Sequence, residues 1–172
     1  MNTDILVIII AFCLLLVASV YLTVHRLLLA DERRRNIELL KTSKSLTVPM
    51  RLQAYERLIL FLERISPDAM LLKLKNQAQT NADLHLAILQ NIRFEYEHNI
   101  SQQLYVSNEI WALVRETKDA VAIFVSDVAK QTEPSHSSIE LANKLLNKIM
   151  ECDEPLVAAT IREIKAEATK IM

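Results

Sequence analysis

Glycine is absent from all 172 residues of this chain, although a typical protein contains roughly 7% of it. Phosphate-binding loops, dinucleotide-binding turns and tight β-hairpins need glycine, because the backbone there takes positive φ angles or approaches a ligand closely. The composition therefore argues against Walker-type ATPases, Rossmann-fold enzymes and protein kinases.

Cysteine and net charge are also scarce. The two cysteines, Cys13 and Cys152, are far apart and form no CxxC pair, so the sequence predicts neither a disulfide framework nor a zinc site. The 20 Lys and Arg residues nearly balance the 21 Asp and Glu residues. Because a nucleic-acid partner requires a basic surface, we expect none here.

The longest uncharged stretch runs from Ile5 to Val24. As a helix it would be about 30 Å long, which matches the hydrocarbon core of a bilayer. Asp4 precedes the run, and the run is longer than the apolar core of a signal peptide, so cleavage is not expected. We predict an uncleaved transmembrane anchor within residues 1–30.

Basic residues lie on one side of this span only. Arg26, Arg33, Arg34 and Arg35 follow it, whereas no Lys or Arg precedes it. By the positive-inside rule the N-terminus faces outward and the C-terminal domain lies in the cytoplasm. Residues 31–48 are then a basic juxtamembrane helix or linker, and these four arginines are candidates for contact with lipid headgroups.

Residues 49–172 show the apolar spacing of helices and no sustained strand-like alternation. The first helix is predicted over residues 50–65, with Pro49 tolerated in its first turn. Its apolar face comprises Met50, Ala54, Tyr55, Leu58, Leu62 and Ile65. The block LILFL is apolar on all sides, so Leu60 and Phe61 are candidates for contact with a partner.

Further helices are predicted from their caps and stripes. Candidate N-caps are Ser66, Thr80 (in a capping box with Asp83) and Ser107, and then Ser135, Ser137 or Ser138. The stripe after Ser107 comprises Ile110, Val114, Thr117, Val121, Phe124 and Val128. Pro134 predicts a loop, and two shorter helices follow it. The fold class is therefore all-α, an N-terminal transmembrane helix followed by an antiparallel helical bundle in residues 49–172.

The segment FEYEHNISQQLY contains the pattern Glu95-x-x-His98, which places a carboxylate and an imidazole on one helical face, as in di-iron carboxylate proteins. A second copy, Glu133-x-x-His136, is interrupted by Pro134 and lies in the predicted loop. We therefore predict no cofactor, no bound metal and no catalytic residue, and keep Glu95 and His98 only as an alternative metal or catalytic site.

The same segment contains the amides Asn99, Gln102 and Gln103. If they are buried, they need hydrogen-bond partners, either in this chain or in another subunit. We therefore include them among the candidate interaction residues.

The segments RLQAYERLILFLERISP and FEYEHNISQQLYVSNEIWALV resemble the two most recognisable parts of an uncharacterised family of small single-pass membrane proteins from Bacteroidetes-type bacteria. The resemblance covers roughly residues 1–130. It implies a bacterial inner-membrane location and a helical cytosolic domain, and it assigns no activity.

The function we predict is that of a membrane-tethered, non-enzymatic interaction or scaffold protein. Its expected partners are membrane lipid and either a second copy or other subunits of an envelope complex; no small-molecule substrate is evident. One alternative is a metal-binding or catalytic bundle around Glu95 and His98. Another is an anionic-lipid-binding domain that uses Arg33 to Arg35.

Overall fold

The computed structural model describes the backbone of residues 3–74 and 77–171, with their side chains except in residues 3–11, at residue 18 and in residues 27–45. Within these residues the chain is all-α, as predicted, with six α-helices and one 3₁₀ helix. The elements are α1 (Thr3–Ile65), α2 (Pro67–Leu74), α3 (Asn81–Asn99), the 3₁₀ helix η1 (Ile100–Leu104), α4 (Asn108–Ala129), α5 (Ser138–Met150) and α6 (Ala158–Ile171).

The chain divides into two compact units, Met1–Thr47 and Val48–Met172. α1 contributes to both, and it continues through Pro49 instead of beginning there. A proline inside a helix removes one backbone donor, and Pro49 is the second residue of the second unit.

The first unit contains the predicted span Ile5–Val24. Its described apolar side chains, which lie between Phe12 and Val24, are all exposed. Among the residues that the structure describes, no helix combines the length and apolarity that a membrane crossing requires. The side chains of residues 5–11 and 18 in the predicted span lie outside the described part, as do those of Arg33, Arg34 and Arg35.

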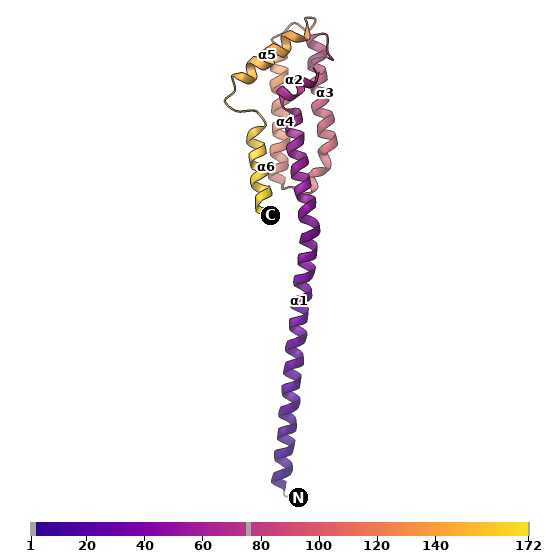
Figure 1. The fold of residues 1–172 in the computed structure, drawn as a ribbon, viewed down its shortest axis with the longest axis vertical. Helices are drawn as coiled ribbons and strands as arrows, with labels where there is room; N and C mark the ends of the chain where they lie inside the picture. The colour runs from indigo at the N-terminus through magenta and orange to yellow at the C-terminus, as the bar shows by residue number, and fades with distance from the viewer. Residues whose placement is uncertain (1–2, 75–76, 172) are drawn as a thin grey trace. The chain divides into compact units, whose positions relative to one another are not determined.

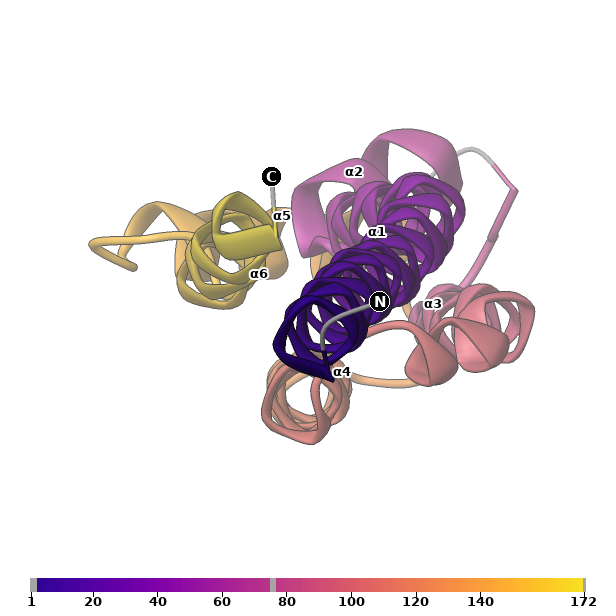
Figure 2. The same cartoon turned by 90° about the horizontal axis from the view of Figure 1, so that it is seen from below.

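The second unit is a helical bundle. The last part of α1 and helices α3, α4 and α6 run side by side (Figure 1), and all four are seen nearly end-on in Figure 2. Two contacts show that α3 and α4 are antiparallel neighbours. Tyr96 near the end of α3 stacks on Trp111 near the start of α4, whereas His85 near the start of α3 contacts Ser126 near the end of α4.

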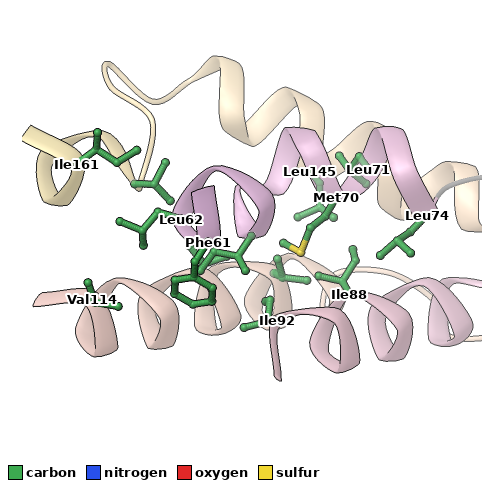
Figure 3. Close-up of a cluster of buried hydrophobic side chains, with 14 of the residues drawn as sticks. Phe61, Leu62, Met70, Leu71, Leu74, Ile88, Ile92, Val114, Leu145 and Ile161 are labelled. Atoms are coloured by element: carbon green, nitrogen blue, oxygen red, sulfur yellow. The ribbon is translucent and has the colours of Figure 1, made fainter. Parts of the chain in front are cut away.

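The core of the bundle is formed by apolar side chains from α1 to α6 (Figure 3). Burying each large apolar side chain contributes about 1.5–3 kcal/mol, so this cluster dominates the stability of the unit. Two predicted positions differ. Met50 is exposed, and Phe61 is a core residue that packs beside Tyr96 instead of facing a partner.

The predicted helix caps are largely confirmed. Thr80 and Asp83 form a reciprocal capping box, and the Ser107 hydroxyl accepts from the backbone N–H of Ile110. Of the three serines proposed before α5, Ser137 is the cap. Ser66 differs, because its hydroxyl donates to the carbonyl of Glu63 at the end of α1. In the stripe of α4, Val125 is buried where Phe124 was predicted, and Phe124 is half-buried.

Candidate interaction surface

The structure separates the two members of the candidate metal pair. Glu95 is buried at the edge of the core, and its Oε2 accepts from Nη1 of Arg64 at 3.3 Å. His98 is exposed, and its ring stacks on Phe94 with 6.5 Å between the ring centroids. No group of three or more His, Cys, Asp or Glu side chains suited to a metal ion occurs in the described part of the chain.

The second Glu-x-x-His pattern lies in the loop between α4 and α5, as Pro134 predicts. There the Nδ1 atom of His136 lies 2.9 Å from Oε2 of Glu140, one turn into α5. Glu133 contributes its backbone carbonyl, which accepts from the amide of Asn81 at 2.7 Å. Both residues therefore take part in loop packing.

Two of the three predicted amides are buried, and both find partners within the chain. Asn99 donates to the carbonyl of Glu95 at 2.8 Å, and Gln102 donates to the hydroxyl of Ser101 at 3.2 Å. Gln103 is exposed. The buried amides are thus satisfied within α3 and η1, and of the three only Gln103 is exposed.

Part of α1 beside α3 and η1 is exposed. Residues of α1 spaced by three and four line two adjacent hollows that share Arg57. One hollow is lined by Met50, Gln53, Arg57, Ser101, Gln102, Leu104 and Tyr105, and the other by Arg57, Leu60, Phe61, Arg64, His98 and Asn99. We call these two hollows, which meet at Arg57, the α1–α3 groove.

The groove combines apolar and basic groups. Leu104 is 78% exposed and Leu60 is 46% exposed, although both are large apolar residues. Exposed large apolar side chains that gather at a hollow mark interaction sites more often than isolated ones do. The aromatic ring of Phe94, stacked on His98, extends the apolar surface along α3.

The ionisable side chains that line the groove are Arg57, Arg64 and His98. Arg64 is already paired with Glu95, whereas Arg57 forms no ion pair or hydrogen bond with another described residue. No carboxylate lines either hollow. A ligand of this groove is therefore expected to be apolar with acidic groups.

Sequence reasoning missed a cluster of hydrogen bonds around one carboxylate, that of Glu167. Glu167 of α6 accepts from the hydroxyl of Tyr55 at 2.5 Å, from the backbone N–H of Ser107 at 3.0 Å and from the Ser107 hydroxyl. The Nη2 atom of Arg51 lies 3.9 Å from the carboxylate and donates to the Tyr55 hydroxyl at 3.0 Å. Glu167 therefore joins α6 to α1 and to the N-cap of α4.

The pKa values of this cluster follow from its contacts. Burial alone would raise the pKa of Glu167, but hydrogen bonds from Ser107 and Tyr55 outweigh it, and the net pKa is below 4.5. The pKa of Tyr55 is raised, first by burial and then by its hydrogen bond to Glu167. No local pattern marks Glu167, because its partners are far away in sequence.

Asn81 is a second polar residue that joins distant segments. Its buried amide donates to the carbonyl of Glu133, and its Oδ1 accepts from the backbone N–H of Leu141 in α5 at 3.0 Å. Its own backbone N–H donates to the carbonyl of His136 at 2.8 Å. Asn81 thus fixes the start of α3 against the loop and the first turn of α5.

A histidine and a serine meet between α3 and α4. Nε2 of His85 lies 3.1 Å from Oγ of Ser126, and the Ser126 hydroxyl also donates to the carbonyl of Ala122 at 2.8 Å. The serine oxygen can then accept a hydrogen bond from the imidazole. In this arrangement the histidine does not act as a base that activates the serine as a nucleophile. Burial lowers the pKa of His85 below 6.5, consistent with a neutral ring.

Comparison with known proteins gives one family. Residues 2–171 match DUF7935, a family of unknown function. The chain belongs to this family. No curated protein and no solved structure matches it significantly. The family description says nothing about membrane location or source organism, so those parts of the resemblance remain predictions for this DUF7935 member.

Proposed function

We propose that this DUF7935 protein is a membrane-tethered, non-enzymatic interaction protein that uses the α1–α3 groove to bind another protein chain. The partner is a second copy or another subunit of a bacterial envelope complex. The observation that carries the proposal is the groove itself, which combines exposed apolar side chains with the exposed guanidinium of Arg57, a group that has no ion-pair partner among the described residues.

The membrane tether is supported by the first unit. The described apolar side chains between Phe12 and Val24 are exposed, and they occur all round the helix. A helix that is apolar on every side is stable in lipid or when buried in protein. The basic residues that follow favour an outside N-terminus, a cytoplasmic bundle, and headgroup contacts from Arg26, Arg33, Arg34 and Arg35.

The non-enzymatic part of the proposal is supported by the roles of the polar side chains. Glu95, Glu167, Asn81 and the His85–Ser126 pair all join helices or loops of the bundle. Each of these side chains is hydrogen-bonded to its neighbours, and together they do not form a nucleophile and base that face a common pocket.

The test is site-specific crosslinking in the native membrane. A photoreactive residue at Leu60 in the groove is expected to give a discrete crosslinked product, whereas one at the exposed Leu72 of α2 is the matched control and is expected to give none. Membrane tethering is checked in the same cells by extraction with alkaline carbonate. A product equally strong at both positions, or none at Leu60, would contradict the proposed surface.

A further inference from the structure

α5 carries an apolar stripe that nothing in the bundle covers. Leu141, Ala142 and Leu145 face the core, yet Ile139, Leu146 and Met150 of the same helix are exposed. Ile139 is 65% exposed and Met150 is 82% exposed. The spacing of seven and four residues aligns these three side chains along one side of the helix. We call them the α5 stripe.

The stripe and the groove have similar lengths. Met50 and Leu60 are ten residues apart on α1, which corresponds to about 15 Å of helix. Ile139 and Met150 are eleven residues apart on α5, which corresponds to about 16 Å. A helix laid along the groove would therefore place its apolar residues opposite the stretch between Met50 and Leu60.

The charges at the end of the stripe suit the groove as well. Glu151, Asp153 and Glu154 follow Met150 directly in an exposed segment. Glu151 pairs with Lys148 and Glu154 pairs with Arg162, whereas Asp153 forms no ion pair with another described residue. The free carboxylate of Asp153 complements the free guanidinium of Arg57, and such complementarity orients two surfaces as they meet.

From these observations we infer that the α5 stripe of one copy docks in the α1–α3 groove of a second copy. This inference rests on the proposed function and names the partner as another molecule of the same chain. Apolar contact comes from Leu146 and Met150 against Leu60 and Leu104, while the acidic segment after Met150 lies toward the basic groove.

Each chain offers one groove and one stripe. If a two-fold axis relates two chains, two reciprocal groove–stripe contacts close an isologous dimer. If no two-fold axis relates them, the contact is heterologous and repeats into a ring or a longer assembly.

The test uses two full-length variants, purified in a mild detergent and measured by sedimentation over a range of concentrations. The groove variant carries Arg57→Glu and Leu104→Glu, and the stripe variant carries Leu146→Glu and Met150→Glu. All four positions are exposed, so the fold is expected to persist. Leu72→Glu, at an exposed position outside both surfaces, is the control.

We expect the wild type and the Leu72→Glu control to associate with rising concentration. Each surface variant alone should associate at least about tenfold more weakly, since charge enters an apolar contact. A one-to-one mixture of the two variants should form a mixed complex, because an intact groove then meets an intact stripe. Two identical surfaces meeting each other would not give this complementation.

A wild type that stays monomeric, surface variants that associate like the wild type, or a mixture that stays monomeric would each overturn the inference. The proposed function is judged separately. A crosslink from Leu60 to a different protein would retain the interaction role and reject the second copy, whereas the absence of any crosslink from Leu60 would reject both.

Discussion

Replacing Glu167 by alanine is expected to loosen the junction of α1, α4 and α6. The substitution removes the acceptor of three hydrogen bonds, and it leaves the hydroxyl of Tyr55, a residue that is only 2% exposed, without its carboxylate partner. The guanidinium of Arg51 also loses a nearby countercharge.

The expected magnitude follows from these contacts. A hydrogen bond to a charged group contributes about 1.5–3 kcal/mol net, and a buried donor left without a partner costs about 1–3 kcal/mol. Because Ser107 is partly accessible to water, part of this loss is recovered. We expect Glu167→Ala to lower the free energy of unfolding by about 2–4 kcal/mol, and the isosteric Glu167→Gln by about 1–2 kcal/mol.

Thermal unfolding can be followed through Trp111, which is the only tryptophan and lies in the bundle beside Tyr96. For a domain of this size about 1 kcal/mol corresponds to about 3–6 °C, so a loss of about 2–4 kcal/mol in Glu167→Ala should lower Tm by about 6–24 °C. Glu163→Ala is the matched control, since Glu163 is an exposed carboxylate on the same helix. Its Tm should change little.

The pH dependence gives an independent check. Because the folded-state pKa of Glu167 lies below its ordinary value of 4.5, its contribution to stability is fully present above pH 4.5 and is lost as the pH falls through the folded pKa. The difference between the wild type and Glu167→Gln should therefore shrink in acid. Equal Tm values for the Glu167→Ala and Glu163→Ala variants, or a difference that persists unchanged in acid, would refute this reasoning.

Three other predictions concern the joints between helices. Asn81→Ala should cost about 2–4 kcal/mol in denaturant unfolding, because three segments lose a common partner, whereas the exposed Asn143→Ala should cost under about 0.5 kcal/mol. Thr117→Val should lower the free energy of unfolding by about 1–2 kcal/mol, because it leaves the buried hydroxyl of Thr160, 2.6 Å away, without its partner. Adding Thr160→Val should recover part of that loss, and strictly additive costs would contradict a hydrogen-bonded pair. The folded-state pKa of His85 is below 6.5, so its contribution favours folding above pH 6.5 and is lost as the pH falls toward the folded pKa. His85→Gln should flatten stability in that range, and an unchanged pH profile would count against a half-buried neutral ring.

Family membership and the proposed interface address different questions. The match to DUF7935 covers residues 2–171 and therefore includes both compact units, but it assigns no activity. The groove and the α5 stripe therefore provide the most direct experimental access to function, because both are exposed and can be changed without disturbing the core.

Local features of this protein were accessible from the sequence. The Thr80–Asp83 capping box, the Ser107 cap and the loop around Pro134 depend on residues within one or two turns of each other. The helical periodicity predicted the all-α class and most of the buried stripe of α4 for the same reason. Glycine's absence argued against several nucleotide-binding folds before any contact was known.

The tertiary structure decided what distant residues do. Leu60 and Phe61 are neighbours in an apolar block, yet a helical step of about 100° buries Phe61 in the core and leaves Leu60 exposed. Glu167 looks like any helix carboxylate until folding brings it to Tyr55 and Ser107. Periodicity shows that a side chain lies on a face, but only the packing of other helices determines whether that face is covered.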